Sequence, residues 1–445
     1  MSRKYFGTDG VRGRVGETPM TVDFALRLAS AAARVLAPGG GTVLIGKDTR
    51  LSGYMFEAAL EAGFTAAGAH VLLAGPLPTP AVAYLCRELG ADFGIVISAS
   101  HNLYDDNGIK IFAAGGEKLS DEQEAAIEAL LEEPPLTRES AALGRARRVD
   151  HARVDYQEFC KSMLAPGARL NGFSLVVDCA HGAAYKVAPR VLSELGAEII
   201  PIGCSPNGRN INQGCGSTQP ELLATTVKGV GAAMGVALDG DGDRCVLVDE
   251  RGELVDGDQL LYVLASDAQA RGELRGPVVG TVMSNLGLEQ ALGEMGIPFV
   301  RAKVGDRYVM SMLKKEGGQL GGETSGHLIN LARTSTGDGL ATALQVLAVM
   351  QRTGRPLSEL VAGMKRLPQV MINVRVARRI DVDGQPAIVD AVRAVEAELG
   401  ERGRVVLRAS GTEPVIRVMI ESTDAAEGRA FAERLAEVVR AAAED

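Results

Sequence analysis

The chain of 445 residues lacks the features that would place it in a membrane or outside the cell. No apolar stretch approaches the roughly 20 residues of a membrane-spanning helix. Residues 1–4 lead into no apolar signal-peptide core. The six cysteines are scattered and form no CxxC pair, which favours reduced thiols over a disulfide framework. We therefore expect a soluble cytoplasmic protein.

The chain also lacks an excess of basic residues. Lysine and arginine number 47, aspartate and glutamate 56, and the net charge at pH 7 is −9. This balance argues against a dedicated nucleic-acid-binding protein, although it leaves room for a local basic pocket. Hydrophobic content of 46% and charged content of 23% are typical of globular proteins. Because a chain this long exceeds a single core, we expect an enzyme of three or four domains.

What the sequence does contain is a run of carboxylates separated by single glycines. Asp239, Asp241 and Asp243 follow the apolar run 234–238, and Arg244 closes the run. We call residues 239–244 the acidic loop. An apolar run that ends in glycines predicts a buried strand opening into a tight loop. Crowded carboxylates repel one another unless a cation neutralises them, and oxygen ligands in so compact a loop favour Mg²⁺. The alternative is a solvated acidic turn.

A pattern of strand, helix and strand recurs along the chain. Helical patterns end at Gly90, Gly196 and Gly296, each where a helix C-cap is expected, and an apolar segment follows each. Strand-like runs precede them at 42–45, 174–177 and 277–280. The repetition predicts three successive α/β units with mixed, largely parallel sheets.

Composition indicates where the units end. The sequence Glu-Glu-Pro-Pro at 132–135 closes the first helical stretch, and a polar, arginine-rich connector runs on to about Asp150. After residue 368 the pattern predicts a smaller α+β domain of strand (370–376), helix (387–399), strand (405–408), strand (415–420) and helix (425–443). We expect four domains around a central cleft, at 1–150, 151–255, 256–368 and 369–445.

Each α/β unit carries a loop of small residues with polar side chains. In the first loop, residues 98–102, Ser100 and His101 follow the apolar run 93–97. The second is the acidic loop and the third is 321–327. Because ligands bind beyond the carboxyl ends of strands in open sheets, we expect the three loops to face one cleft. No Ser-His-Asp triad is legible, so acyl transfer is not favoured, and a helix-capping role is the alternative for Ser100.

Two further segments have a composition that suits phosphate. Residues 408–414 combine backbone N–H groups and hydroxyls in one loop, flanked by Arg408 and Arg417. Residues 6–13 are glycine-rich, with Arg12 as the cation, and Lys110 follows a turn that leads toward the same cleft. The alternatives are a hairpin turn for 408–414 and a solvated charge for Lys110.

These motifs together resemble those of the α-D-phosphohexomutase superfamily over essentially the whole chain. Its serine, metal, sugar and phosphate loops are similar, in this order, to residues 98–102, 239–244, 322–327 and 408–414. Within it, the chain resembles the bacterial phosphoglucosamine mutases at 5–10 (YFGTDG), 178–183 (DCAHGA) and 303–308 (KVGDRY). Two departures from the family pattern, Leu103 and Gln219, concern loop rigidity rather than the chemistry.

The resemblance implies an enzyme that carries a phosphoryl group on Ser100. It would interconvert glucosamine 6-phosphate and glucosamine 1-phosphate, with glucosamine 1,6-bisphosphate as intermediate and primer, and feed amino-sugar nucleotide and cell-wall precursor synthesis. The implied cofactor is one Mg²⁺ per chain, held by Asp239, Asp241, Asp243 and the phosphate on Ser100. A phosphomannomutase or phosphoglucomutase with the same mechanism is the alternative.

The resemblance also implies roles for other residues. Arg12, Lys110 and Arg244 would offset developing charge, and Lys110 or His101 would move the hydroxyl proton, a choice that the sequence leaves open. The implied substrate-binding residues are Glu323, Ser325, His327, Arg408, Ser410, Gly411, Thr412 and Arg417.

Two other classes of function fit parts of the sequence. One is a phosphatase with Asp239 and Asp241 as the carboxylate pair, and the other is a non-catalytic sugar-phosphate sensor on the same fold. The expected partner is a small sugar phosphate, with no nucleic acid and no membrane. The oligomeric state is left open, with a homodimer among the alternatives.

Overall fold

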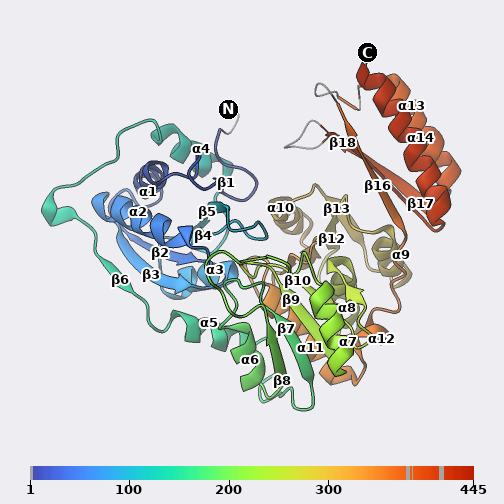
Figure 1. Ribbon diagram of the computed structural model, residues 1–445, viewed down its shortest axis with the longest axis horizontal. Helices are drawn as coiled ribbons and strands as arrows, with labels where there is room; N and C mark the ends of the chain where they lie inside the picture. The colour runs from blue at the N-terminus through green and yellow to red at the C-terminus, as the bar shows by residue number, and fades with distance from the viewer. Residues whose placement is uncertain (1–3, 377–380, 383, 410–414, 445) are drawn as a thin grey trace.

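The structure is a computed structural model that describes residues 4–376, 381–382, 384–409 and 415–444. Four sheets follow one another along the chain, each with its covering helices, and the first and last of them lie at opposite sides of the molecule (Figure 1). We call these sheets and their helices the first to fourth units. Among the described residues, no helix is both long and apolar enough to cross a lipid bilayer.

The first unit has a six-stranded sheet in the order β1-β5-β4-β2-β3-β6. Strands β2, β3, β4 and β6 run parallel, whereas β5 is antiparallel to β4 and β1. The strands are β1 (Val11–Arg14), β2 (Thr42–Lys47), β3 (His70–Pro76), β4 (Phe93–Ile97), β5 (Asp106–Ala113) and β6 (Ala146–Arg148). The helices are α1 (Val22–Leu36), α2 (Ser52–Ala66), α3 (Thr79–Glu88) and α4 (Asp121–Leu130), with a short 3₁₀ turn, η1 (Ser140–Ala142), before β6.

The segment expected to be a connector differs from its prediction. Residues 146–148 form β6 and add an edge strand to the first sheet, beside β3. All three side chains are exposed, so the segment has none of the apolar alternation by which a strand is recognised in a sequence. Helix α5 (Ala152–Lys161) then leads into the second unit.

The second and third units have mixed sheets in which the central pairs are parallel. In the second, the order is β11-β10-β9-β7-β8, with β7 parallel to β8 and β9. In the third, the order is β13-β12-β14-β15, with β12 parallel to β13 and β14. The second unit's elements are β7 (Ser174–Asp178), α6 (Ala188–Glu194), β8 (Glu198–Ile202), α7 (Glu221–Val230), β9 (Met234–Leu238), β10 (Cys245–Val248) and β11 (Leu254–Val255). The third unit's are α8 (Gly257–Ala270), β12 (Val278–Thr281), α9 (Leu286–Glu294), β13 (Phe299–Ala302), α10 (Asp306–Glu316), β14 (Leu320–Gly322), β15 (Leu328–Asn330), α11 (Gly339–Thr353) and α12 (Leu357–Leu360).

The fourth unit is an antiparallel sheet in the order β16-β18-β17, covered by two helices. Its elements are β16 (Gln369–Arg375), α13 (Pro386–Leu399), η2 (Gly400–Arg402), β17 (Gly403–Ala409), β18 (Val415–Ser422) and α14 (Ala425–Glu444). The predicted fold class, three α/β units and a smaller α+β domain, is therefore confirmed. The glycines predicted to end helices, Gly90, Gly196 and Gly296, have φ angles of 63°, 98° and 70°, which glycine adopts without strain.

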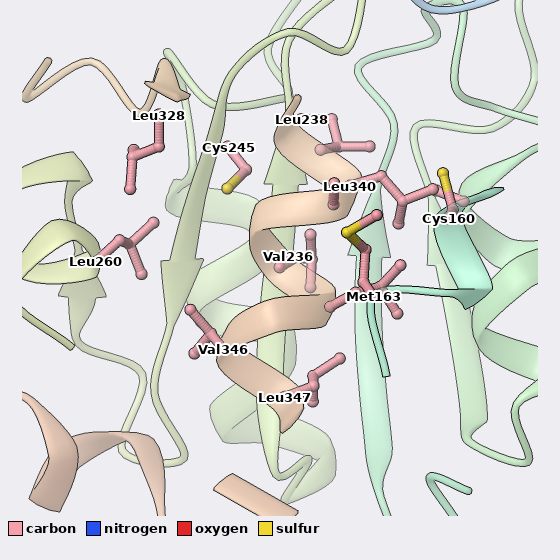
Figure 2. Packing of buried hydrophobic residues seen from close by; sticks show 14 of the residues in the cluster. Cys160, Met163, Val236, Leu238, Cys245, Leu260, Leu328, Leu340, Val346 and Leu347 are labelled. Carbon is pink, nitrogen blue, oxygen red and sulfur yellow. The ribbon is translucent and has the colours of Figure 1, made fainter. Parts of the chain in front are cut away.

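The largest apolar core joins the first three units. Figure 2 shows α11, whose Leu340, Val346 and Leu347 belong to the same buried cluster as Val236 and Leu238 of β9. A helix that follows the third sheet in sequence therefore covers the second sheet. Because separating these units would expose a shared core, they are held together by the hydrophobic effect.

The fourth unit instead has a core of its own and meets the third unit through polar contacts. Arg404 donates to the carbonyl oxygens of Val282 at 3.0 Å and of Ser284 at 2.6 Å. The buried Glu421 accepts from Leu286 N at 3.0 Å. Such an attachment is typical of domains that can shift relative to one another.

A buried carboxyl group fixes the start of α11. Asp338 caps the helix by accepting from Ala341 N at 2.9 Å, and Tyr156 of α5 donates its hydroxyl to the other oxygen at 2.8 Å. Burial raises the pKa of Asp338 to about 6, although both hydrogen bonds act to lower it. The folded protein therefore binds this proton more tightly than the unfolded chain does.

This shift makes stability depend on pH in a defined direction. Asp338 contributes most below its unfolded pKa of about 3.9, and the contribution is lost as the pH rises through 6. Asp338→Asn does not ionise and keeps the capping oxygen. Between pH 5 and 7 we expect the free energy of unfolding of the wild type to fall by about 1 kcal/mol relative to this variant, with no further change above pH 7. Urea unfolding at several pH values measures the difference, and a constant difference would contradict the argument.

Candidate active site

The serine loop and the acidic loop meet at the carboxyl ends of the strands that precede them. Ser100 follows β4, and the acidic loop joins β9 to β10, which pair as an antiparallel hairpin. Ser100 is buried and donates its hydroxyl to Asp239 Oδ2 at 2.7 Å. Its φ angle is +51°, an uncommon backbone conformation for a residue other than glycine. The hydroxyl is thereby held against the carboxylates of another unit.

The three aspartates of the acidic loop form a compact cluster of oxygens. One carboxylate oxygen from each of Asp239, Asp241 and Asp243 lies within 4.8 Å of the others, and all three residues are buried. Asp241 Oδ1 and Asp243 Oδ1 are buried with no hydrogen-bond partner. Buried orphan oxygens are costly, and oxygen-only ligands suit a hard divalent cation. The donor set therefore fits Mg²⁺.

Two carboxyl groups of the cluster, those of Asp239 and Asp243, have pKa values shifted in opposite directions. Burial raises the pKa of Asp239 well above its usual range, and repulsion from Asp243 and Asp241 adds to the effect. Burial would also raise the pKa of Asp243, but Lys110 and His327 outweigh it and hold that pKa well below its usual range. The cations beside the cluster thus decide which carboxylate stays ionised.

Lys110 lies on β5 and contacts two of the three aspartates. Its Nζ is 2.8 Å from Asp241 Oδ2 and 3.3 Å from Asp243 Oδ2. A third carboxylate, that of Asp9, is 2.8 Å from the same nitrogen. Although burial acts to lower it, these carboxylates hold the pKa of Lys110 well above its usual range. Lys110 is therefore a permanent cation in this arrangement.

Asp9 is a site residue to which the sequence analysis gave no role. Besides Lys110, it binds Arg12 at 2.8 Å and Lys118 at 2.6 Å. Lys118 in turn contacts Asp306 of the third unit at 2.5 Å. The only signal in the sequence was the position of Asp9 and Asp306 inside two of the family-like segments, 5–10 and 303–308.

His101 stands between the serine hydroxyl and an arginine. Its Nδ1 is 3.3 Å from Ser100 Oγ and 3.2 Å from a guanidinium nitrogen of Arg244. Because a guanidinium can only donate, Nδ1 accepts and is unprotonated. Burial lowers the pKa of His101 to about 4, and Arg244 and Arg12 add to the shift. The ring is therefore neutral near pH 7.

His327 in the third unit has the opposite charge state. Burial acts to lower its pKa, but Asp243, at 3.7 Å, together with Asp306 and Glu323 raises it to about 9. Glu323 accepts from Gly305 N at 2.9 Å, which fixes the start of the segment that leads into α10. Ser325, by contrast, lies exposed in the turn after Glu323.

A cavity of about 380 Å³ lies where the first three units meet. Its lining contains Arg12, Arg244, Glu323, His327 and residues from 5–10, 243 and 304–306. The volume falls in the range of small-molecule sites. Ser325, Arg408 and Arg417, although described, are not part of this lining.

The phosphate loop is described only at its ends. Arg408 and Arg417 are directly opposed on β17 and β18, and burial together with Arg417 lowers the pKa of Arg408. Two opposed guanidinium groups repel each other, and a bound anion would relieve this repulsion. Ser410, Gly411 and Thr412 lie outside the described residues.

The two active-site histidines should titrate at opposite ends of the pH range. In protein treated with EDTA, we expect His101 to stay neutral down to about pH 4 and His327 to stay protonated up to about pH 9. NMR spectra of the five histidines, assigned with His101→Gln and His327→Gln, measure both values. Titration of both rings near pH 6.5 would contradict the described contacts.

Comparison with known proteins gives the same pattern over all four units. Models of the phosphoglucomutase/phosphomannomutase family match in order: alpha/beta/alpha domain I at 3–137, domain II at 155–252, domain III at 256–367 and the C-terminal domain at 371–438. A phosphoglucosamine mutase of Alkalilimnicola ehrlichii is 58% identical over 443 residues, which cover 99% of this chain and 98% of that protein.

Solved structures share the fold. A phosphoglucomutase/phosphomannomutase family protein of Burkholderia thailandensis has a TM-score of 0.82 at 25% identity, covering 98% of this chain and 97% of that one. An Aspergillus fumigatus N-acetylphosphoglucosamine mutase, in complex with GlcNAc-6P and magnesium, has a TM-score of 0.71 at 19% identity, covering 99% of this chain and 96% of that one. On the full-length identity and the four matching domains, this chain belongs to the phosphoglucosamine mutase family of the phosphohexomutases.

Proposed function

We propose that this protein interconverts glucosamine 6-phosphate and glucosamine 1-phosphate with Ser100 as its phosphoryl carrier. The observation that carries the proposal is the contact of 2.7 Å between Ser100 Oγ and Asp239, inside a cluster of three buried carboxylates. A nucleophile beside a metal-type oxygen cluster suits phosphoryl transfer, which needs positioning and charge neutralisation more than covalent chemistry from the protein. The identity of the sugar, glucosamine, is inferred from membership of the phosphoglucosamine mutase family.

The reaction consists of two phosphoryl transfers, the first from Ser100 to the sugar and the second from the sugar back to Ser100. The 1-hydroxyl of glucosamine 6-phosphate attacks the phosphorus on Ser100, so a sugar O–P bond forms and the Ser100 Oγ–P bond breaks. The product, glucosamine 1,6-bisphosphate, turns over within the cavity. Ser100 Oγ then attacks the 6-phosphate, which releases glucosamine 1-phosphate and restores the phosphoserine.

Asp239, Asp241 and Asp243 are the residues that would hold Mg²⁺, with an oxygen of the Ser100 phosphate as a further ligand. Bound there, the ion would neutralise charge on the transferring phosphoryl group. The two orphan oxygens, Asp241 Oδ1 and Asp243 Oδ1, support this assignment. The magnesium complex of the Aspergillus fumigatus enzyme is a further parallel at the level of the fold.

The attacking hydroxyl must lose a proton and Ser100 Oγ must gain one. His101 Nδ1 lies 3.3 Å from Ser100 Oγ and has a lone pair to accept with. Lys110, a permanent cation beside Asp241, would donate hydrogen bonds and offset negative charge rather than release its proton. Arg12 and Arg244 line the cavity and would offset the charge that develops in the transition state.

The remaining assigned residues would bind substrate. Glu323 and His327 line the cavity and can reach sugar hydroxyls and a phosphate respectively, while the exposed Ser325 would act as a hydroxyl donor at its edge. Arg408 and Arg417, with Ser410, Gly411 and Thr412, would grip the phosphate that does not react. Since these belong to the polar-attached fourth unit, closure of that unit would bring them to the cavity and keep water from the phosphoserine.

The proposal has a defined scope. The chain would act in the cytoplasm, as a homodimer or a monomer, with domains at 1–150, 151–255, 256–368 and 369–445. The second candidate function is that of a phosphomannomutase or phosphoglucomutase. It is supported by the likeness to the Burkholderia thailandensis phosphoglucomutase/phosphomannomutase family protein, at 25% identity. Rates on glucosamine, glucose and mannose phosphates under the same conditions separate the two.

Replacement of the carrier should abolish turnover. We expect Ser100→Ala, primed with a sugar 1,6-bisphosphate, to form glucosamine 1-phosphate on the order of 10⁴-fold or more slowly, because no alternative nucleophile occupies its position. Peptide mass spectrometry should find phosphate on Ser100 in the wild type. Ser140→Ala, at an exposed serine that is not part of the cavity lining, serves as the control. Release of inorganic phosphate by Ser100→Ala would favour an aspartyl phosphatase mechanism instead, retained formation of glucosamine 1-phosphate would refute Ser100 as the carrier, and wild-type protein with no turnover would favour the sensor.

Loss of one carboxylate should weaken metal binding. We expect Asp241→Asn to bind Mg²⁺ on the order of 100-fold more weakly, since a direct ligand contributes at least as much as the residues around it. Calorimetric titration with Mg²⁺ measures this, and activity at saturating Mg²⁺ measures the catalytic loss. Asp267→Asn, which removes a carboxylate paired with Arg271 outside the site, should change neither. Equal Mg²⁺ affinity in Asp241→Asn and the wild type would refute the metal site.

A further inference from the structure

Arg50 is a fully buried arginine directly beneath the serine loop. It follows β2, and its guanidinium donates to the carbonyl oxygens of Ser100 at 3.3 Å and Asn102 at 2.6 Å. The same group forms an ion pair with Asp48. A buried arginine that binds two backbone carbonyls fixes the path of the chain between them.

The ion pair of Arg50 and Asp48 also fixes the backbone N–H group of Ser100, through the hydroxyl of Ser98. Asp48 Oδ2 accepts from the hydroxyl of Ser98 at 2.5 Å, and that hydroxyl accepts from Ser100 N at 2.9 Å. The N–H and the C=O of Ser100 are therefore both bound to buried side chains. This accounts for the left-handed backbone of Ser100, because such a conformation persists only where the surroundings determine it.

A second donor reaches the same two carbonyls from the second unit. Asn212 Nδ2 lies 2.8 Å from Ser100 O and 2.9 Å from Asn102 O. Asn212 is buried and has a φ of +59°, a backbone conformation that asparagine tolerates better than most residues. Its amide thus ties the serine loop to the unit that carries the acidic loop.

The acidic loop packs against this contact. A Cβ atom at Gly240 would lie 2.6 Å from both Ser100 O and Asn212 Nδ2, so only glycine fits between Asp239 and Asp241. The backbone between Asp239 and Asp241 therefore packs directly against the carbonyl oxygen of Ser100. Any displacement of the Asn212 amide would change the distance between the nucleophile and the acidic loop.

We infer that Asn212, together with Arg50, is a positioning residue for phosphoryl transfer. This inference rests on the proposed function, because it assigns no chemistry of its own to the amide. The amide is not part of the cavity lining, and it acts by holding Ser100 Oγ in line with the reacting phosphorus. Because near-attack geometry tolerates little error, a displacement of about 1 Å can lower the rate on the order of 100-fold.

The direct test removes the Asn212 amide without disturbing the backbone. Asn212→Gly keeps access to positive φ and deletes both hydrogen bonds. Asn212→Asp keeps the shape but turns a carboxylate oxygen toward the carbonyls, so repulsion replaces attraction. The matched controls are Asn210→Gly and Asn210→Asp, at a residue of the same loop whose side chain bonds within that loop, to Asn207 N and Ser205 O.

The expected result is a split between the kinetic parameters. In the two Asn212 variants we expect kcat to fall about 10- to 100-fold, with the lower kcat in Asn212→Asp. The KM for glucosamine 6-phosphate should stay within about twofold of the wild-type value. Single-turnover transfer from a sugar 1,6-bisphosphate to Ser100, followed by rapid quenching and peptide mass spectrometry, should slow by the same factor. Circular dichroism and Mg²⁺ affinity should match the wild type.

Several outcomes would overturn the inference. Wild-type kcat in both Asn212 variants would show that the amide does not position the nucleophile. A rise in KM alone would place its effect on substrate binding, and an equal loss in the Asn210 controls would place it in the loop as a whole. If Asn212→Gly does not fold, Asn212→Asp carries the same comparison. A wild-type enzyme without mutase activity would instead refute the proposed function.

Discussion

Repulsion among three buried carboxylates is the constraint around which this molecule is organised. Asp239, Asp241 and Asp243 converge within 4.8 Å, where burial alone would favour their neutral forms. Each of the first three units supplies a cation against this cluster: Lys110, Arg244 and His327. A cluster that needs neutralisation from three directions suits an enzyme that must accept a doubly charged phosphoryl group and then return it. The acidic loop thus determines the charge states of its neighbours and supplies the oxygen cluster that fits a metal ion.

The placement of Ser100, the proposed nucleophile, depends on the same convergence. The hydroxyl comes from the first unit and its acceptor, Asp239, from the second, so neither unit alone would assemble the site. The shared core explains how the assembly stays in register, since α11 of the third unit packs on β9, the strand that leads into the acidic loop. The relative position of the serine loop and the acidic loop is therefore maintained by apolar packing, which is dense and has low compressibility.

Much of the fold followed from local patterns, and the reasons are physical. The central strands β2, β7, β9 and β12 are largely apolar because they are covered on both faces, and glycines mark the helix ends at Gly90, Gly196 and Gly296. The exposed strand β6 carries no such pattern, so its sequence predicts a connector. In the site, the acidic loop could be predicted because three ligands lie within five residues. The chain from Asp9 through Lys118 to Asp306 could not, because its members lie far apart in sequence and their pairing exists only in the folded molecule. The same holds for His101 and His327: both appeared as histidines beside polar loops, and only their neighbours drive one pKa to about 4 and the other to about 9.

The contrast between the two kinds of unit contact bears on how a substrate can react at both of its ends. In the proposed mechanism a hexose bisphosphate presents first one phosphate and then the other to Ser100, so the groups that transfer phosphate would stay fixed while those that hold the second phosphate release and rebind it. The first three units share a core, and pulling them apart would expose apolar surface. The fourth has its own core and meets the third through Arg404, Glu421 and backbone groups, contacts that water can replace at a smaller cost in free energy. The separate cores therefore match the proposed roles of the units: rigid packing surrounds Ser100, the proposed phosphoryl carrier, and exchangeable polar contacts attach the unit that bears Arg408 and Arg417.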